Sequence, residues 1–248
     1  MKYSDFLKKI HFRFYRPSSR LRGFSEITKL LRFINVSFEI LNTSLPQEAI
    51  LERSGLKTLC KIPRMSTYAI GAMINYGVSR MQPGTCFVNV GVWHGFTLLA
   101  GMIGNDNKKC IGVDNFSSFG GPQAQFRERF NRYKGTNHYF YEKDCVEYFS
   151  ESHNDPIGFF LYDGNHSYKN QLLALQTAEP FFSKNCIIMI DDTNWEEPRQ
   201  ATLDFVANRS NKYQILRDTR TYSNRHPTLW NGIMIIQCVN EVQAGQTV

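Results

Sequence analysis

Long apolar runs are missing from this sequence. Its 248 residues nowhere include the roughly eighteen consecutive apolar side chains that a membrane-spanning helix needs, and we expect no transmembrane segment. The N-terminal stretch MKYSDFLKKIHFRFYRP has neither the continuous apolar core nor the small-residue cleavage site of a secretory signal. A cytoplasmic location is therefore expected.

Closely spaced cysteines are also missing. The chain has six cysteines but no Cys-x-x-Cys pair, so a zinc tetrahedron has no starting point. Four of the six lie in or beside apolar strand-like runs, which predicts buried side chains in a reducing compartment. The six are Cys60, Cys86, Cys110, Cys145, Cys186 and Cys238.

Acidic residues are fewer than basic ones, and the imbalance is uneven along the chain. The formal net charge is +7, and much of the basic excess falls within the first 33 residues. These basic residues are Lys2, Lys8, Lys9, Arg13, Arg16, Arg20, Arg22, Lys29 and Arg32. Two interpretations stay open: a surface for an acidic partner, a membrane or nucleic acid, or the solvated face of a helical appendage. The second is favoured because charge runs usually serve solubility, and we do not expect nucleic acid as a partner.

Internal repeats and low-complexity segments are absent, whereas hydrophobic residues make up 42% of the chain, enough for one large core. From residue 83 onward, short apolar runs alternate with amphipathic segments, which predicts the strands and crossover helices of a largely parallel sheet. The apolar runs cover residues 86–92, 109–114, 138–144, 157–164, 185–192, 213–219 and 230–239, and the expected helices cover 95–103, 122–133, 168–182 and 197–208. Only a loop separates the last two runs, so this pair is expected to be antiparallel.

The first 82 residues differ in character from the rest. Helix-like segments are predicted over residues 26–41 and 66–81, with Ser66 as the N-cap of the second and a joint at residues 81–84. We therefore expect an N-terminal helical appendage (1–82), an α/β domain (83–240) and a C-terminal tail (241–248).

A glycine-bearing turn follows the first strand of the α/β domain. Gly91 and Gly95 would let the backbone approach a ligand closely where a helix begins. Asp114 lies nineteen positions after Gly95 and ends the second strand, where an acid can bind a ribose diol. Trp93 occupies the middle glycine position of the dinucleotide fingerprint, which counts against a nicotinamide enzyme. Asp144, after the third strand, could meet an adenine edge or cap a helix.

Acidic residues also end the fourth and fifth strands of the predicted sheet. Asp163 follows the fourth strand, and Asp191 and Asp192 end the fifth. The carboxyl ends of neighbouring strands share one crevice, so these carboxylates could bind Mg²⁺ or Ca²⁺; alternatively, two of them cap helices. His166 could act as general base toward a hydroxyl or be an ordinary hydrogen-bonded turn residue.

Four motifs, VNVGVWHG, GVDNFSSFGGP, YDGNHSY and IIMIDDT, follow one another along the chain. Together they resemble the class I S-adenosylmethionine-dependent methyltransferases, and within them the macrocin-type and sugar O-methyltransferases, over about residues 60–240. The resemblance implies a Rossmann-like, seven-stranded, mostly parallel sheet with an antiparallel last strand and helices on both faces. It also implies that Gly91 and Gly95 border the methionine part of the cofactor, that Asp114 binds its ribose, and that Asp144 and Cys145 neighbour its adenine. The full set of expected cofactor-binding residues is Asn89, Gly91, Trp93, Gly95, Asp114, Asn115, Asp144, Cys145 and Asp163.

The resemblance implies roles near the reacting atoms as well. In metal-dependent members the equivalents of Asp163, Asp191 and Asp192 hold a magnesium ion that orients substrate hydroxyls, and we expect Asp163, His166 and Asp191 to be catalytic. Two positions depart from the family pattern. Asn89 replaces an acid that reaches the amino end of the cofactor, and Asn165 replaces an Asp proposed as base in some members. Because an amide takes no proton, His166, a metal-bound hydroxyl or solvent would have to accept it, unless the substrate needs no base.

The expected function is methyl transfer from S-adenosylmethionine to an oxygen of a small molecule, such as a sugar or natural-product hydroxyl. The residues before 83 and the segment 118–122 are expected to close over the substrate as a lid. Two alternatives stay open: a protein of this fold that binds without chemistry, suggested by Asn89 and Asn165, and an RNA-modifying methyltransferase, suggested by the basic N-terminus. A homo-oligomer is a further expectation.

Overall fold

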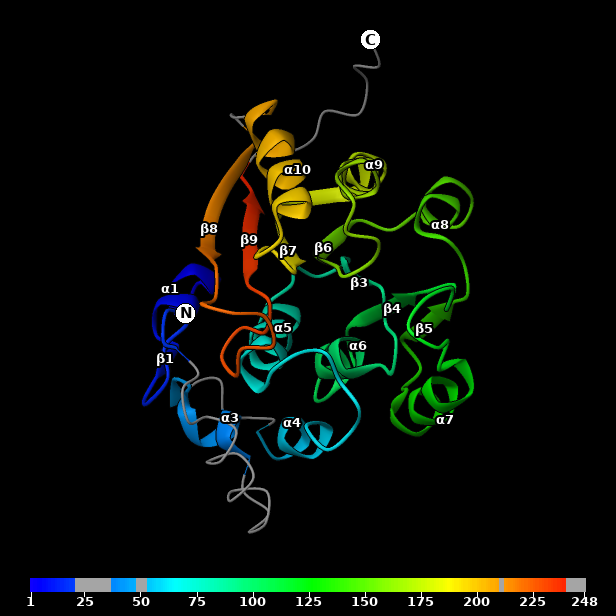
Figure 1. The fold of residues 1–248 in the computed structure, drawn as a ribbon. Coiled ribbons are helices and arrows are strands. Elements are labelled where there is room, and N and C mark those ends of the chain that lie inside the picture. Colours follow the sequence, from blue (N-terminus) through cyan, green and yellow to red (C-terminus); the bar gives the residue numbers. More distant parts are fainter. Residues whose placement is uncertain (21–36, 48–52, 210–211, 240–248) are drawn as a thin grey trace.

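The computed structural model describes residues 1–20, 37–47, 53–209 and 212–239, which form a central seven-stranded sheet (Figure 1). The strand order is β5-β4-β3-β6-β7-β9-β8. The strands are β3 (Cys86–Val90), β4 (Lys109–Val113), β5 (His138–Tyr141), β6 (Ile157–Tyr162), β7 (Phe182–Asp191), β8 (Tyr213–Thr219) and β9 (Ile233–Cys238). Strand β9 runs antiparallel to both β7 and β8, and the pairs from β5 to β7 are parallel. The predicted Rossmann-like α/β class and the antiparallel last strand are confirmed.

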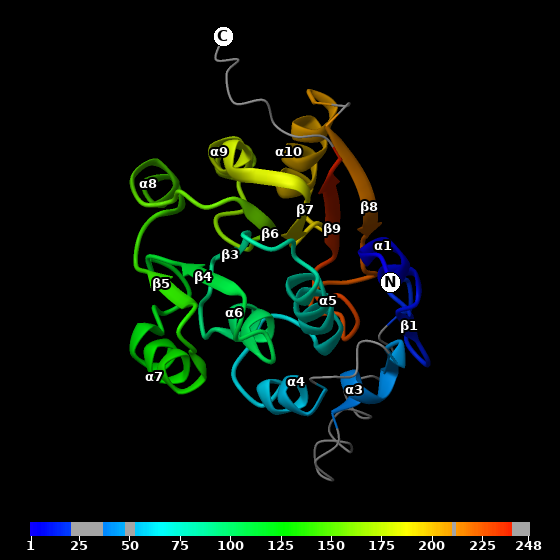
Figure 2. The ribbon, with the colours of Figure 1, turned by 180° about the vertical axis from the view of Figure 1, so that it is seen from behind.

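Helices cover both faces of this sheet, as the continuous hydrophobicity of β3 and β6 requires; every residue of these two strands is buried. Figures 1 and 2 show α8, α9 and α10 on one face and α5, α6 and α7 on the other. The bounds are α5 (Tyr68–Ser79), α6 (Phe96–Met102), α7 (Gln123–Tyr133), α8 (Cys145–Glu151), α9 (Tyr168–Ala178) and α10 (Glu196–Ala207). Alternate strand residues divide the core, because Phe87 and Phe159 belong to one hydrophobic cluster and Val88 and Phe160 to the other.

The described N-terminal residues pack onto the first of these clusters. In α1 (Tyr3–Lys8), the Phe6 ring stacks on Tyr76 of α5 with centroids 3.9 Å apart, and the Tyr3 ring meets the edge of Phe159 at 6.0 Å. The remaining elements of this region are β1 (His11–Phe12), β2 (Thr43–Ser44), α3 (Phe38–Asn42) and α4 (Arg53–Leu59). This part of the chain therefore shares a core with the sheet, and the division at residue 82/83 stays a prediction.

Several element boundaries differ from the sequence-based ones. Of the helix predicted over 26–41, residues 26–36 lie outside the described residues, and the helix that is described there covers Phe38–Asn42. The helix predicted over 66–81 is α5, and it is capped one residue later than predicted, because the Thr67 side chain, not that of Ser66, accepts the Ile70 N–H. The predicted helix 168–182 ends at Ala178 and continues as a 3₁₀ turn, Glu179–Phe181, since Pro180 cannot donate a backbone hydrogen bond. The tail 241–248 is outside the described residues.

Strand ends shift in a way that matters for the site. Asp114, Asp144 and Asp163, which were expected as the last strand residues or next to them, lie in loops just beyond β4, β5 and β6. Loop residues at the carboxyl edge of a parallel sheet can turn their side chains into the crevice there. Asp191, by contrast, is the last residue of β7.

Two smaller predictions concern the cysteines and the membrane. All six cysteines are free thiols, four of them buried and two half-buried, as expected for small apolar side chains. Within the described ranges no helix combines the length and the apolar composition that crossing a bilayer demands.

Candidate functional site

A large cavity lies at the carboxyl edge of the sheet. It has a volume of about 800 Å³, within the range of small-molecule and cofactor sites. Its walls come from the loops after β3, β4, β5 and β6, from the first turns of α8 and α9, from the residues after β7, and from the loop between β8 and β9. Among the residues predicted from the sequence, nine line it: Gly91, Trp93, Asp114, Asn115, Asp144, Cys145, Asp163, His166 and Asp192.

The floor of the cavity is a close approach between two loops. Gly91 follows β3 with a positive φ of 78°, and a Cβ on it would lie 1.9 Å from the backbone oxygen of Asp163. The Asp163 N–H donates to the carbonyl of Val90 (3.0 Å), and the Gly91 N–H donates to that of Val113 (2.9 Å). Only glycine allows this combination of backbone angle and contact, so the glycine predicted to border a ligand has a definite structural reason.

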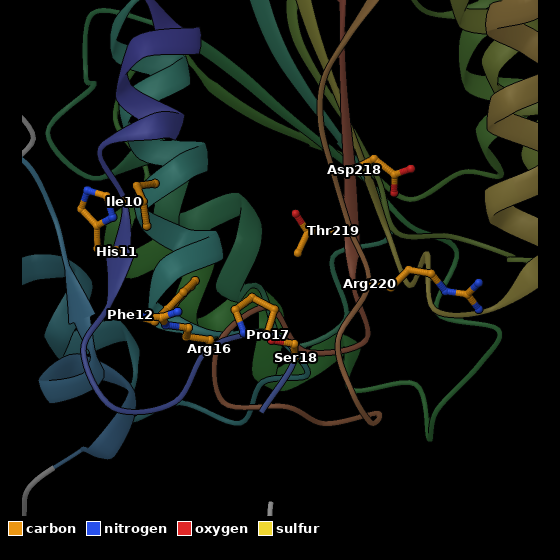
Figure 3. Close-up of a pocket in the computed structure, with 9 residues that line it drawn as sticks. All are labelled: Ile10, His11, Phe12, Arg16, Pro17, Ser18, Asp218, Thr219 and Arg220. Carbon is orange, nitrogen blue, oxygen red and sulfur yellow. The ribbon is translucent and has the colours of Figure 1, made fainter. Parts of the chain in front are cut away.

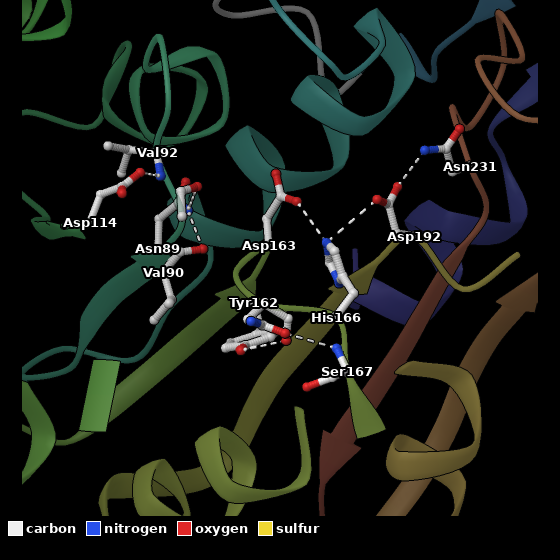
Figure 4. Close-up of polar contacts among 12 residues, drawn as sticks. Asn89, Val90, Val92, Asp114, Tyr162, Asp163, His166, Ser167, Asp192 and Asn231 are labelled. Atoms are coloured by element: carbon white, nitrogen blue, oxygen red, sulfur yellow. Dashed lines mark hydrogen bonds and ion pairs between the residues drawn. The ribbon is translucent and has the colours of Figure 1, made fainter. Parts of the chain in front are cut away.

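Asp114 is held by backbone N–H groups on the wall beside Gly91. Its Oδ2 accepts hydrogen bonds from Val92 (2.8 Å) and Trp93 (2.9 Å), and its Oδ1 accepts one from Phe116 (2.7 Å). A carboxylate has about four acceptor positions, so acceptor capacity is left for a ligand in the cavity. Figure 4 shows the carboxylate turned toward Val92, in the loop after β3.

The segment after Asp114 forms one side of the cavity mouth. Phe116, Phe119 and Gly121 all have positive φ angles, and the Asn115 side chain accepts the Ser117 N–H (3.1 Å). The Trp93 indole N–H donates to the Phe119 carbonyl (3.1 Å). Phe119 lines the cavity while 72% of its surface is exposed, so the segment expected as part of a lid borders the opening.

Asp144 and Cys145 form the wall at the start of α8. The Asp144 carboxylate accepts the Val146 N–H (2.9 Å) and caps this helix, which realises the capping role left open from the sequence. It also lines the cavity. Burial raises the pKa of the Cys145 thiol to about 12, with the nearby Asp144 charge adding to the shift, so Cys145 is an apolar wall residue and not a nucleophile.

A cluster of two carboxylates and an imidazole lines the same cavity, and Figure 4 shows the His166 ring facing the carboxylates of Asp163 and Asp192. His166 Nε2 is 3.5 Å from Asp163 Oδ1 and 3.4 Å from Asp192 Oδ2. Burial raises the pKa of Asp163 well above its ordinary value, and the charges of Asp192 and Asp114 add to this. The pKa of Asp192 is also raised by burial. Burial lowers the pKa of His166, against the opposing charge of Asp192. The three residues could place one ligand atom each around a cation, since those atoms lie within 4.8 Å of one another.

Asp191 lies next to this cluster but behind the wall. Its side chain is buried, Oδ1 has no hydrogen-bond partner among the described residues, and it does not line the cavity. Burial raises its pKa well above the ordinary value, reinforced by the charges of Asp163 and Asp192. The structure therefore brings Asp163, His166 and Asp192 together on the wall, and the ligand and catalytic roles of Asp191 stay predictions.

Three other predicted residues also have local partners. The fully buried Asn89 amide donates to the carbonyls of Val90 (3.2 Å) and Gly91 (3.0 Å) and does not line the cavity. Gly95 is the N-cap of α6 with φ 98° and packs near the Phe126 ring, again off the cavity wall. Asn165, in the loop before α9, accepts the Ser167 N–H through its side chain (3.0 Å), so it stabilises a turn.

The loop between β8 and β9 supplies site residues that the sequence did not predict. Asn231 Nδ2 donates to Asp192 Oδ1 (2.7 Å), and Asn231 Oδ1 accepts the backbone N–H of Arg225 (2.7 Å). Arg225, Trp230 and Asn231 all line the cavity. Their nearness to Asp192 depends on β9 pairing with β7, a contact that no local sequence pattern reveals.

A second cavity of about 590 Å³ lies between the N-terminal segment and β8 (Figure 3). Apolar Ile10 and Phe12 form part of it, and its carboxylate, Asp218, is paired with Arg199. In Figure 3 the Arg220 side chain points away from the side chains of the N-terminal segment. This cavity lacks the converging, charge-perturbed side chains of the first, which is therefore the candidate active site.

Comparison with known proteins agrees with this geometry. Residues 88–193 match a family model described as a methyltransferase domain; this span begins in β3 and ends just after Asp192. No curated protein sequence matches the chain.

Solved structures of low sequence identity share the fold. A Corynebacterium glutamicum protein matches with a TM-score of 0.57 and 12% identity over 89% of this chain and 99% of its own. A Klebsiella pneumoniae protein described as a candidate O-methyltransferase matches with a TM-score of 0.55 and 9% identity, over 87% of this chain and 97% of its own. The methyltransferase PaMTH1 of Podospora anserina was solved with S-adenosylhomocysteine bound. It matches with a TM-score of 0.52 and 16% identity, over 79% of this chain and 89% of its own. Bacterial proteins described as rRNA methylases have the fold as well. The chain thus has a Rossmann-like methyltransferase fold.

Proposed function

We propose that this protein transfers a methyl group from S-adenosylmethionine to an oxygen of a small molecule. The observation that carries the proposal is a single cavity with two unlike halves: a glycine turn with a fixed carboxylate, and a cluster of Asp163, His166 and Asp192. The match of residues 88–193 to a methyltransferase domain supports it.

The cofactor half fits an adenosyl group on three observations. Gly91 lines the cavity without a side chain, Asp114 retains acceptor capacity toward the cavity, and the cavity is large enough for a nucleoside together with an acceptor. Gly91 and Trp93 would border the methionine part, Asp114 and Asn115 the ribose, and Asp144 and Cys145 the adenine. Asn89 and Gly95 would act through the backbone, since neither lines the wall.

The acceptor half has a group that can take the proton released in the reaction. When bound, S-adenosylmethionine supplies the methyl carbon, and the bond from acceptor oxygen to that carbon forms as the carbon–sulfur bond breaks with its electron pair left on sulfur. The acceptor hydroxyl proton goes to His166 Nε2, which faces Asp163 and Asp192. These carboxylates stabilise the resulting imidazolium, so neutral His166 can act as general base.

A divalent ion is the alternative way to use the same three residues. The carboxylates were expected to bind Mg²⁺ or Ca²⁺, and a set of two carboxylates and one imidazole also suits Mn²⁺ or Zn²⁺. An ion would offset the burial that raises the pKa values of Asp163 and Asp192, together with the repulsion that adds to the shift at Asp163, and it would lower the pKa of a bound hydroxyl. An ion on His166 Nε2 would exclude that atom as base, so the two mechanisms can be separated by experiment.

Isothermal titration with S-adenosylmethionine and S-adenosylhomocysteine tests the cofactor proposal without knowledge of the acceptor. Binding of both is expected, and Asp114→Asn should weaken it. No heat with either ligand would refute the proposal.

Titration with Mn²⁺ in the presence of S-adenosylhomocysteine tests whether an ion binds. Loss of Mn²⁺ binding in Asp192→Asn favours the metal mechanism, and turnover unchanged by a chelator favours His166 as base. Because the sequence predicts a catalytic role for Asp191, its replacement by Ala should abolish turnover and leave cofactor binding intact.

A second candidate function is cofactor binding without methyl transfer. Asn165, whose side chain is engaged in a turn, favours it because no carboxylate stands at that position. Cofactor binding together with a failure to methylate any small hydroxyl compound would support this alternative. The cytoplasmic location, the homo-oligomer and the macrocin-type branch stay predictions.

A further inference from the structure

The loop between β8 and β9, residues 220–232, forms one part of the cavity wall. Of all the lining residues, those of this loop are the most distant from Gly91 along the sequence. It follows Thr219 at the end of β8 and leads into Ile233 at the start of β9. Asn224, Arg225, Trp230 and Asn231 of this loop line the cavity. Since Asn231 also bonds to Asp192, the loop lies on the acceptor side and not on the cofactor side.

Arg225 is an unusual residue for this wall. The acidic residues that line the cavity are Asp114, Asp144, Asp163, Asp192 and Glu197, and the basic ones are Lys143 and Arg225. Lys143 pairs with Glu147 and Glu151. Among the residues that the structure describes, no carboxylate lies within ion-pair distance of the Arg225 guanidinium. Arg225 is thus an exposed cation on a mostly acidic cavity wall, with no carboxylate partner in the part of the chain that the structure describes.

The backbone at Arg225 is a second, independent observation. Its φ is +57°, a region that glycine or asparagine adopts with ease and a long side chain rarely does. The buried Asn231 side chain holds this conformation by accepting the Arg225 N–H at 2.7 Å. Trp230 has φ +53° and is bridged to His226 by two backbone hydrogen bonds, of 2.9 and 3.0 Å. Both left-handed non-glycine residues of the loop line the cavity, which is where strained residues of functional importance concentrate.

We propose that the acceptor carries an anionic group, a carboxylate or a phosphate, and that Arg225 binds it while Trp230 contacts the body of the acceptor. A guanidinium binds either anion through paired, charge-assisted hydrogen bonds. Asn231 links the two ends of the acceptor site, because it joins the Arg225 backbone to Asp192. The anion would fix the distance from its own position to the hydroxyl that is methylated. This inference rests on the proposed function and names its substrate class.

Binding to the complex with S-adenosylhomocysteine tests the inference with matched probes. One series is catechol and 3,4-dihydroxybenzoate; the other is glucose, glucuronate and glucose 6-phosphate. The anionic members are expected to bind more tightly than the neutral ones, and the comparison of glucuronate with glucose 6-phosphate distinguishes carboxylate from phosphate. Replacing Arg225 by Gln should weaken the anionic members by roughly ten- to a hundredfold and leave the neutral members and S-adenosylhomocysteine unchanged.

Arg225→Gly is the sharpest variant because glycine suits a φ of +57°. Its melting temperature should be no lower than that of the wild type while anion binding is lost, a combination that a merely structural role for Arg225 would not give. Arg220→Gln is the matched control: Arg220 is in the same loop but lines the second cavity, so the variant should bind the anionic probes as the wild type does.

Three outcomes would overturn the inference. They are equal binding of neutral and anionic probes, unchanged anion binding in Arg225→Gln, and no binding of any probe at millimolar concentration to protein that does bind S-adenosylhomocysteine. If S-adenosylhomocysteine itself fails to bind, the proposed function fails first, so the two failures are distinguishable.

Discussion

The backbone oxygen of Asp163 occupies the space that a side chain on Gly91 would need, 1.9 Å from the position of its Cβ. This contact sets the spacing of the loops after β3 and β6, and therefore the spacing of the two halves of the cavity. The two halves are the cofactor wall at Asp114 and the cluster of Asp163, His166 and Asp192.

Gly91→Ala should consequently be severe. It adds a Cβ against rigid backbone and forces alanine into a φ of +78°, and we expect a loss of about 3 kcal/mol or more in the free energy of unfolding. Gly84→Ala is the matched control, because Gly84 has the same φ of +78° but no atom within 4 Å of the added Cβ. Its cost should be only about 1 kcal/mol. Urea unfolding of both variants checks this, and equal losses would contradict the role of the Asp163 contact.

Asp114→Asn should reduce both cofactor affinity and stability. Three backbone N–H groups donate to the two oxygens of Asp114, and an amide replaces one of these acceptors by a donor. We expect the dissociation constant for S-adenosylhomocysteine to rise tenfold or more and the free energy of unfolding to fall by about 1–3 kcal/mol. Asp144→Asn is the control for stability, since Asn caps a helix as well as Asp does. If Asp114→Asn binds S-adenosylhomocysteine as tightly as the wild type does, Asp114 is not part of the cofactor site.

His166 predicts the pH dependence of turnover. Burial lowers its pKa below the ordinary value of 6.5, so the neutral base persists at pH 7 and is lost only as pH falls below about 6.5. With an acceptor that is turned over, kcat/KM should be level between pH 7 and 8 and fall in more acidic buffer. His166→Gln should lower the rate by about a hundredfold. It should also abolish the part of the acidic fall in kcat/KM that depends on the histidine. A wild-type limb centred well above pH 7 would argue for a different base or a metal-bound hydroxyl.

Asp191→Asn should stabilise the protein at neutral and higher pH. The folded pKa of Asp191 is raised by burial and by Asp163 and Asp192, so ionisation costs free energy that appears as pH rises through the folded pKa. Removal of the charge should raise the free energy of unfolding by about 1 kcal/mol at pH 8, and the gain should shrink as pH falls. Thermal unfolding from pH 5 to pH 8 measures it. Turnover of the same variant then tests the predicted catalytic role of Asp191.

The sequence predicts the sheet well because its strands are buried on both faces. Runs such as 157–164 leave few alternatives to a strand covered by helices, and the short link before the last run requires an antiparallel pair. The element ends were predicted less well. A strand ends where backbone pairing stops, as β6 does at Tyr162, and hydrophobicity does not mark that point.

The candidate site divides in the same way. Glycines and acids at strand ends are visible in the sequence, and Gly91, Asp114, Asp163 and Asp192 all line one cavity. Arg225 and Asn231 are brought there by the pairing of β9 with β7, and their importance depends on contacts 39 residues away in the chain, as from Asn231 to Asp192. The positive φ angles of Arg225, Trp230 and Gly232 are a local property of the loop. The contact of the loop with Asp192 depends on tertiary structure.

The loop between β8 and β9 is also tied to the beginning of the chain. The Tyr222 N–H donates to the carbonyl of Pro17 (2.7 Å), His226 Nε2 bonds to that of Ser19 (3.1 Å), and the Thr67 hydroxyl donates to that of Thr228 (2.7 Å). Sequence changes near residue 18 could therefore reshape the proposed acceptor site and leave the proposed adenosyl site untouched. Substitutions in this N-terminal segment could in this way change acceptor selectivity, although Pro17 and Ser19 do not line the candidate active site.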